Sequence, residues 1–381
     1  MQEQISIKFK ELFQTEGGFF ASPGRINLIG EHTDYNGGFV FPGAVDKGMI
    51  AEIKPNGTGT VRAYALDLSD YAEFGLTEEA APKASWARYI FGVCREIIKR
   101  GGNIQGFDTV FAGDVPLGAG MSSSAALEST FAFALNELFA LGIDKFELAK
   151  IGQSTEHNYC GVKCGIMDQF ASAMGKKDNE IFLDTATLNF EYAPVKLENA
   201  SIVVTNSKVK HSLVDSAYNT RRSECETALK ELQTVLDIKT LGDLTREEFE
   251  ANVSAIKDPV RVKRARHAVY ENIRTIDAIE SLKKGDINTF GKLMIDSHTS
   301  LRDDYEVSCE EIDILVEEAL KIDGVIGSRI TGGGFGGCTV SIVLNDSIEE
   351  FKDKVSSAYT EKTGIVPEIY LVSVGDGPSK L

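Results

Sequence analysis

The chain has 381 residues, of which 57 are acidic and 40 are basic, and its formal net charge is −17 at pH 7. This acidity argues against nucleic acid or an anionic membrane as a partner, so an anionic ligand would need locally arranged donors or a metal ion. Because the length exceeds the usual size of a single core and 43% of the residues are hydrophobic, we expect two domains.

The residues that follow Met1 show neither the charged nor the apolar region of a signal peptide, and no apolar segment is long enough to cross a bilayer. We therefore expect a cytoplasmic protein whose six scattered cysteines are reduced. A zinc site at His157, Cys160 and Cys164 is disfavoured, because no second ligand pair follows at metal-binding spacing.

Hydrophobic periodicity in the first half of the chain predicts a mixed α+β domain that ends near residue 190. We expect a helix at residues 2–15, short strands up to residue 76 (among them 39–45, 49–53 and 61–65), helices at 86–99, 124–141 and 146–159, and a strand at 107–113.

Residues 22–38 concentrate polar side chains between glycines, among them Arg25, Glu31, His32 and Asp34. A folding core does not need this density of polar groups, whereas sugar hydroxyls donate and accept hydrogen bonds and are recognised by carboxylates and amides. A solvated turn capped by Asp34 is the structural alternative. The segment predicts a sugar site that would reject analogues leaving its polar groups unpaired.

Residues 116–128 run from small residues and hydroxyls directly into a helix-forming sequence. Glycine lets the backbone approach a ligand, and the first helical turn offers unpaired N–H groups and the positive end of its dipole to phosphate. No G-x-x-x-x-G-K-[ST] match exists, which excludes a P-loop, while simple capping of a core helix remains the alternative. The nucleotide-binding residues expected here are Pro116, Leu117, Gly118, Ala119, Gly120, Met121, Ser122, Ser123, Ser124 and Ala125.

The second half of the chain, residues 191–381, predicts a split β-α-β sandwich with helices over one face of an antiparallel sheet. We expect a strand at 202–206, a long helical stretch at 217–320, strands at 325–331 and 339–344, a helix at 348–363 and a strand at 368–374. Within the helical stretch, Pro259 starts one helix and Gly285 separates two others.

Residues 331–338 satisfy G-x-G-x-x-G at Gly332, Gly334 and Gly337, but the match is misleading. A dinucleotide-binding fingerprint opens a helix, whereas the apolar, β-branched residues from Cys338 onward predict a strand. We expect the glycines to form a tight connection between two strands, with the backbone lying against a ligand or another loop.

Taken together, these segments resemble the GHMP small-molecule kinases, and the first resembles the signature G-R-x-N-L-I-G-E-H-T-D-Y-N of the members that phosphorylate galactose. The resemblance covers nearly the whole chain in order, at residues 24–36, 116–126, 164–170, 211–225 and 331–340. It implies a ribosomal-protein-S5-like first domain at residues 1–190, a ferredoxin-like second domain at 191–381 and an active site in the cleft between them. It also implies a monomer that uses ATP to phosphorylate the C1 hydroxyl of galactose, the first committed step of galactose catabolism.

The resemblance assigns roles to individual residues. Asp168 matches the catalytic aspartate that faces the anomeric hydroxyl and acts as general base, and Arg25 matches the arginine beside it. The sequence leaves open whether Asp168 removes the proton fully or only orients the hydroxyl. The galactose-binding positions implied are Arg25, Glu31, His32, Asp34, Gly165, Asp168 and Tyr218. Ser124 and Glu156 resemble the two positions that hold Mg²⁺. Trp86 lies where the family lines its adenine pocket, although core packing is an equal alternative.

Two other functions remain open at this stage. A kinase of the same family for another sugar, such as N-acetylgalactosamine or arabinose, would share the phosphate loop, and Glu31, His32 and Asp34 do not separate these substrates. A sugar-sensing regulator that binds without turnover is disfavoured, because the chain keeps Ser124, Ala125 and Asp168.

Overall fold

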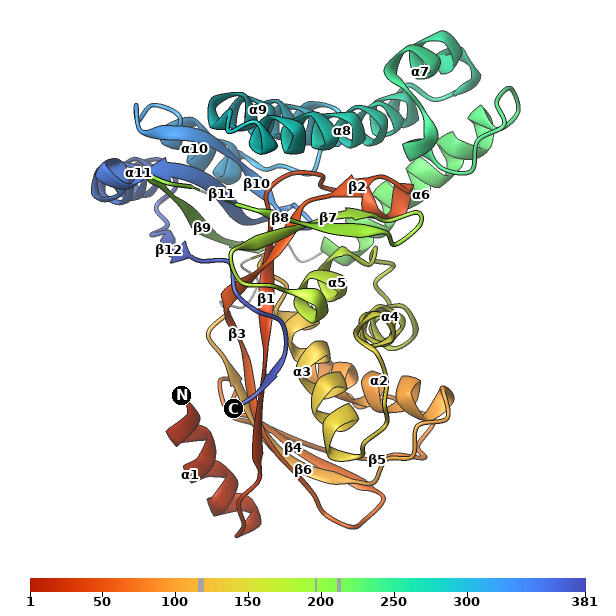
Figure 1. Ribbon diagram of the computed structural model, residues 1–381, viewed down its shortest axis with the longest axis vertical. Coiled ribbons are helices and arrows are strands. Elements are labelled where there is room, and N and C mark those ends of the chain that lie inside the picture. The colour runs from red at the N-terminus through yellow and green to blue at the C-terminus, as the bar shows by residue number, and fades with distance from the viewer. Residues whose placement is uncertain (116–119, 196, 211–213) are drawn as a thin grey trace.

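The computed structural model describes residues 1–115, 120–195, 197–210 and 214–381. Figure 1 shows a tall lower part built on two long strands and an upper part that carries most of the later helices. The elements up to residue 194 are α1 (Gln2–Phe13), β1 (Gly18–Asn27), a 3-10 turn η1 (Asp34–Asn36), β2 (Phe39–Val40), β3 (Pro42–Pro55), β4 (Thr60–Ala65), β5 (Asp70–Gly75), α2 (Ser85–Lys99), β6 (Phe107–Gly113), α3 (Ser123–Leu138), α4 (Lys145–Thr155), a π-helical turn η2 (Glu156–Cys160), α5 (Met167–Met174), β7 (Asn179–Asp184) and β8 (Phe190–Pro194).

The later elements, apart from β13, form most of the upper part. They are β9 (Ala200–Lys210), α6 (Val214–Leu232), α7 (Arg246–Asn252), α8 (Pro259–Lys283), α9 (Ile287–Asp303), α10 (Glu310–Ala319), β10 (Val325–Thr331), β11 (Gly336–Leu344), α11 (Ile348–Thr363), β12 (Glu368–Val372) and β13 (Ser379–Lys380). No helix within the described ranges is both long and apolar enough to cross a membrane.

A six-stranded sheet in the order β13-β1-β3-β6-β4-β5 forms the lower part, and its strands are antiparallel except for the β4–β6 pair. Helices α2 and α3 cover one face, where Phe91 and Phe131 pack with Phe20 and Ile53 of the strands. Helix α1 covers the other face through Ile5 and Phe9. The start of α3 is thereby held beside the upper end of β1.

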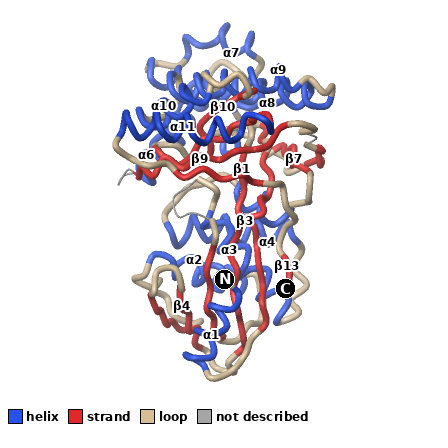
Figure 2. Tube along the Cα trace, turned by 90° about the vertical axis from the view of Figure 1, so that its left-hand side faces the viewer, coloured by secondary structure: helices blue, strands red, loops and turns tan. Residues whose placement is uncertain are grey.

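The second sheet has the order β10-β11-β9-β12 and is antiparallel throughout. Successive β9 side chains point to opposite faces, as expected for a strand. Val203 packs in the core that contains α10 and α11, whereas Ile202 and Val204 share a core with Ile26 and Phe41 of the lower part. Figure 2 shows this sheet lying beneath the upper layer of helices. The second sheet therefore joins the two parts of the molecule through an apolar interface.

The last residues of the chain return to the first sheet. Strand β13 pairs with β1, and the backbone N–H of Leu381 donates to the carbonyl of Phe19 at 3.0 Å. Earlier in this tail, the N–H of Gly375 donates to the carbonyl of Ala44. Figures 1 and 2 both show the two chain ends close together on the lower part. The division of the chain near residue 190 remains a prediction.

The predicted helical stretch at residues 217–320 is divided into five helices, α6 to α10. Asp258 caps α8 by accepting a hydrogen bond from the N–H of Val260, with Pro259 in the first turn as predicted. Gly285, at φ 75°, separates α8 from α9. The glycines at 332–337 connect β10 to its antiparallel neighbour β11, which confirms the predicted strand-to-strand connection.

Candidate active site

A cavity of about 210 Å³ lies where the upper end of β1, the start of α3 and α6 meet the connection between β10 and β11. It brings together residues that lie up to about 300 positions apart in the sequence. Its lining comprises Arg25, Glu31, His32, Asp34, Tyr89, Ser124, Glu156, Val162, Cys164, Gly165, Met167, Asp168, Tyr218, Gly332 and Gly333. All the residues predicted to bind sugar and both residues predicted to hold Mg²⁺ are among them.

Asp168 and Arg25 form a two-pronged ion pair at this cavity. The Arg25 guanidinium donates from Nε to Oδ1 and from Nη2 to Oδ2 of Asp168, each at 2.8 Å. Arg25 is buried, whereas the Asp168 side chain is 30% exposed, so a buried cation holds the carboxylate while part of it stays accessible. Ser122, just before α3, also donates its hydroxyl proton to Asp168. Asp168 therefore faces the cavity with both oxygens fixed by neighbouring donors.

Glu31 is anchored by strand β10 and the glycine-rich connection behind it. Its Oε1 accepts hydrogen bonds from the N–H of Gly332 at 2.7 Å and the hydroxyl of Thr331 at 3.1 Å, and it lies 3.0 Å from Arg329 Nη2. Arg329 is fully buried. Because its charge is balanced on the protein side, Glu31 can present its other oxygen to a ligand hydroxyl.

Asp34 lies against the loop that leads to α5. Its carboxylate accepts hydrogen bonds from the backbone N–H groups of Tyr35 at 3.1 Å and Met167 at 3.4 Å. Desolvation, followed by repulsion from Asp168, raises the pKa of Asp34 from 3.8 to about 7. A Cβ atom at Gly165 would lie 1.7 Å from Asp34 Oδ2, so glycine is required for this close approach.

His32 is buried and has φ 61°, a left-handed conformation that non-glycine residues seldom adopt. Burial, together with the nearby His267, lowers the pKa of His32 to about 3, so its ring is neutral. The ring centroid lies 5.3 Å from that of Tyr218, which reaches the cavity from α6. The two rings form an aromatic wall beside the carboxylates.

The predicted phosphate loop is described only from Gly120 onward, and Pro116, Leu117, Gly118 and Ala119 lie outside the described residues. Helix α3 begins at Ser123, one residue before the predicted start, and Ser122 before it has φ 55°. Among the remaining predicted loop residues, Met121 and Ala125 are buried in the core. Among the loop residues that the structure describes, Ser124 alone lines the cavity, which the buried Glu156 also lines.

Trp86 does not line this cavity. Its ring is 8% exposed and packs in the core of the lower part, 5.4 Å from the ring of Phe111. The indole N–H donates to Asp70 Oδ2 at 2.8 Å. The structure thus gives Trp86 the surroundings of a core residue, which was the alternative to an adenine contact.

Several residues beside the site had no predicted role. Glu128 is fully buried one turn into α3, where burial and repulsion from Glu156 raise its carboxyl pKa well above 4.5. It accepts a hydrogen bond at 3.1 Å from Gln169, the residue next to Asp168. Both residues lie inside the segments singled out from the sequence, whereas Tyr89 and Tyr305 belong to no motif.

Three family models match the chain. The galactokinase galactose-binding signature matches residues 7–55, the GHMP kinase N-terminal domain matches 88–176, and the GHMP kinase C-terminal domain matches 278–361.

Curated relatives match over the whole length. The galactokinases of Clostridium acetobutylicum and Fusobacterium nucleatum are each 50% identical to this chain, covering 99% and 100% of it and 98% and 100% of their own lengths. The structure of Lactococcus lactis galactokinase complexed with galactose matches with a TM-score of 0.97 and 41% identity over 100% of both chains. Mevalonate kinase of Methanococcus jannaschii shares the fold, with a TM-score of 0.64 and 17% identity over 96% of this chain and 100% of its own. These matches show that the chain belongs to the galactokinases of the GHMP kinase family.

Proposed function

We propose that this chain transfers the γ-phosphoryl group of ATP to the C1 hydroxyl of D-galactose, giving galactose 1-phosphate and ADP. The single observation that carries the proposal is the cavity in which Arg25 and Asp168 meet Glu31, His32 and Asp34. Full-length similarity to galactokinases, one of which was solved with galactose, supports the choice of sugar.

The sugar site is a cavity of carboxylates and aromatic rings, which suits a hexose. Carboxylates accept the protons of hydroxyl groups, and each buried acceptor left unpaired by an analogue would cost binding free energy. Glu31, Asp34 and Asp168 supply these acceptors, and the rings of His32 and Tyr218 supply an aromatic wall.

In the proposed reaction, the C1 oxygen of galactose forms a bond to the γ-phosphorus while the bond from that phosphorus to the β–γ bridging oxygen breaks. The hydroxyl proton goes to Asp168, and ADP leaves. The partly exposed Asp168 carboxylate is available for this proton, while Arg25 holds the carboxylate in place. Arg25 also brings a positive charge to the point where phosphoryl charge develops.

The nucleotide would bind at the first turn of α3, whose unpaired N–H groups and positive dipole end favour phosphate. The hydroxyl of Ser124 and the carboxylate of Glu156 are hard oxygen donors that both line the cavity, and such a pair suits Mg²⁺, which keeps phosphate oxygens and water as its other ligands. When bound, Mg²⁺ would neutralise phosphate charge. Substituting Ser124 by alanine or Glu156 by glutamine should each raise the Mg²⁺ concentration needed for half-maximal activity.

Release of ADP, measured with a panel of free sugars, tests the proposal. We expect turnover with galactose well above that with N-acetylgalactosamine, arabinose or glucose. A clear preference for another sugar would show that galactose is not the main substrate. Sugar binding without ADP release would favour a sugar-sensing regulator instead of a kinase. The expected monomeric state and cytoplasmic location remain predictions for gel filtration and cell fractionation.

A further inference from the structure

The imidazole of His32 presents its two nitrogens to different surroundings. Nδ1 lies 2.7 Å from the hydroxyl oxygen of Tyr35. Nε2 is buried and makes no hydrogen bond of normal geometry with any described residue, although His32 lines the cavity. A buried polar atom without a partner lowers stability, so a ligand that bonds to Nε2 would recover that free energy.

Nδ1 is the end of a chain of hydroxyl groups that leads away from the cavity. The Tyr35 oxygen lies 2.7 Å from the Tyr305 oxygen, which in turn lies 3.2 Å from Cys225 Sγ. The neutral ring of His32 has one proton and one lone pair, and each phenol has one proton to donate. The direction of the hydrogen bonds along this chain therefore decides which nitrogen of His32 carries the proton.

The relative strengths of the groups select one direction. A neutral imidazole nitrogen is the strongest base in the chain, so it is the best acceptor for the Tyr35 proton. Tyr305 then donates to Tyr35, and the thiol of Cys225 can donate weakly to Tyr305. This leaves the proton of His32 on Nε2. The backbone of Gly333 lies close enough to the ring to raise the pKa of His32, although burial lowers that pKa by more.

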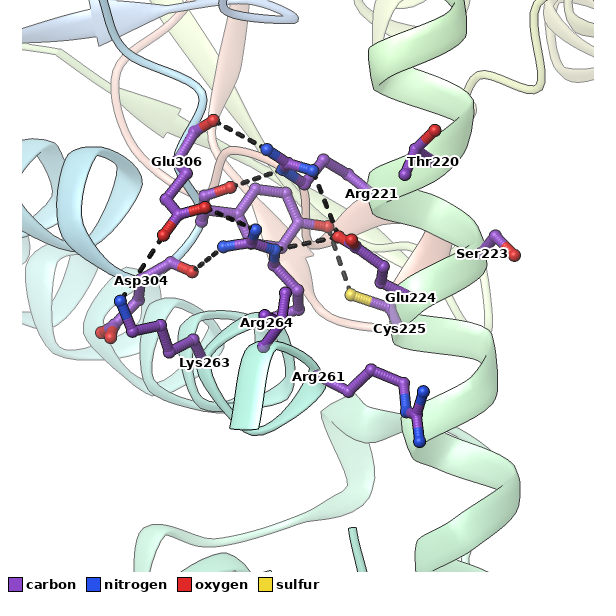
Figure 3. Close-up of polar contacts among 12 residues, drawn as sticks. Thr220, Arg221, Ser223, Glu224, Cys225, Arg261, Lys263, Arg264, Asp304 and Glu306 are labelled. Carbon is purple, nitrogen blue, oxygen red and sulfur yellow. Dashed lines mark hydrogen bonds and ion pairs between the residues drawn. The ribbon is translucent and has the colours of Figure 1, made fainter. Parts of the chain in front are cut away.

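The far end of this chain is held by two arginines, shown in Figure 3. Arg264 Nη1 donates to the carbonyl of Asp304 at 2.6 Å, and Arg221 Nε donates to the carbonyl of Tyr305 at 2.7 Å. Both guanidiniums also bond to Glu224, at 2.9 and 3.2 Å. The backbone on either side of the fully buried Tyr305 ring is thus fixed to α6 and α8. A rigid support of this kind keeps the hydroxyl chain in register.

We propose that Tyr35 and Tyr305 are positioning residues of the sugar site, which hold His32 with its proton on Nε2 so that it donates a hydrogen bond to a substrate hydroxyl oxygen. Glu31, Asp34 and Asp168 of the cavity accept hydrogen bonds, so a neutral N–H donor complements them. One hydroxyl of the substrate can accept from His32 and donate to a carboxylate. The identity of that substrate rests on the proposed function, but the state of the ring does not.

Nitrogen-15 NMR of the unliganded protein tests the state of the ring. The chain has five histidines, so a sample labelled at histidine gives few signals, and His32→Gln identifies those of His32. We expect a protonated Nε2 and an unprotonated Nδ1 that accepts a hydrogen bond. In Tyr35→Phe and, to a smaller extent, Tyr305→Phe, the Nδ1 signal should move toward the position of a nitrogen without a donor. A proton on Nδ1 in the wild type, or unchanged shifts in Tyr35→Phe, would overturn the proposal.

Steady-state kinetics test whether Tyr35 acts through His32. Tyr35→Phe should raise the KM for galactose about tenfold and leave kcat within about twofold, as expected when one buried hydrogen-bond donor is removed. In the His32→Ala background, the same substitution should have no further effect on KM. An equal rise in both backgrounds would contradict the proposed pathway.

Tyr359→Phe is the matched control for both measurements. Tyr359, like Tyr305, is fully buried, and its hydroxyl donates to the carbonyl of Ser207 at 2.8 Å. Its ring is not among the residues that line the cavity. The substitution should reduce stability to a similar extent without changing the His32 signals or the KM. If the wild type did not phosphorylate any sugar, the proposed function would fail, and the NMR result would still decide the state of the ring.

Discussion

Replacement of Asp34 by asparagine should stabilise the unliganded protein at neutral and alkaline pH while weakening its binding of sugar. In the folded protein, desolvation and the neighbouring Asp168 raise the pKa of Asp34 to about 7, and the N–H groups of Met167 and Tyr35 oppose this only in part. In the unfolded chain, the carboxyl has a pKa near 3.8. The native state therefore binds a proton more tightly than the unfolded state does.

The sign and size of the effect follow from this difference. As the pH rises from about 4 to about 7, the unfolded chain loses the proton first, so Asp34 makes the free energy of unfolding fall over that range. Above the folded pKa, this loss is constant. A rise from 3.8 to about 7 corresponds to at most about 4 kcal/mol, at about 1.4 kcal/mol per pKa unit. An uncharged amide removes this pH dependence.

Urea unfolding at several pH values between about 5 and about 8 measures the difference. The fluorescence of Trp86, the single tryptophan, reports unfolding because its ring is buried in the core. Relative to the wild type, Asp34→Asn should gain stability with increasing pH up to about 7 and no more beyond it. Its KM for galactose should rise about tenfold or more.

Asp323→Asn is the control, because Asp323 is an exposed carboxyl in the turn before β10. It should change stability by less than about 0.5 kcal/mol across the same pH range. A stability difference between Asp34→Asn and the wild type that does not vary with pH would refute the electrostatic reasoning, whatever its size.

Three further substitutions test separate parts of the site. Asp168→Asn should lower kcat by about 10²-fold or more, as expected for loss of a general base, with ATP binding nearly unchanged in calorimetry; unaltered turnover would exclude it from the chemistry. Gly165→Ala should raise the galactose KM, because its methyl group would overlap the nearby carboxylate; Gly59→Ala, where a methyl group meets open space, should not. Trp86→Phe should lower the free energy of unfolding by about 1 kcal/mol through loss of the Asp70 hydrogen bond and leave the KM for ATP unchanged. A large rise in that KM would support a contact between Trp86 and adenine.

The cavity wall was largely predictable because its polar residues are clustered locally in the sequence. Glu31, His32 and Asp34 lie within four positions of one another, and glycines on either side mark a tight backbone path. The pairing of Arg25 with Asp168 was not readable from spacing, because 143 positions separate them. It came from the resemblance to a family, and the fold then explains it by placing α5 beside β1.

Other features had no local signal. Tyr305 is one tyrosine in a polar segment between two helices. Its position depends on Arg264 of α8, which lies 41 residues earlier and donates a hydrogen bond to the neighbouring carbonyl of Asp304. The prediction for 217–320 included the breaks at Pro259 and Gly285 but not the one before α7, although the capping box of Thr245 and Glu248 at the start of α7 was present in the sequence. Periodicity indicates that residues are helical more clearly than it indicates where a polar helix stops.

The return of the chain to its first sheet has a consequence for biosynthesis. The outer hydrogen-bonding edge of β1 is completed only by residues 379–381, which are synthesised after the other strands of both sheets. Until then, the unpaired edge of β1 in the nascent chain is exposed and can pair with strands of other chains. Strand β13 thus completes the first sheet only after the strands of the second sheet have been synthesised.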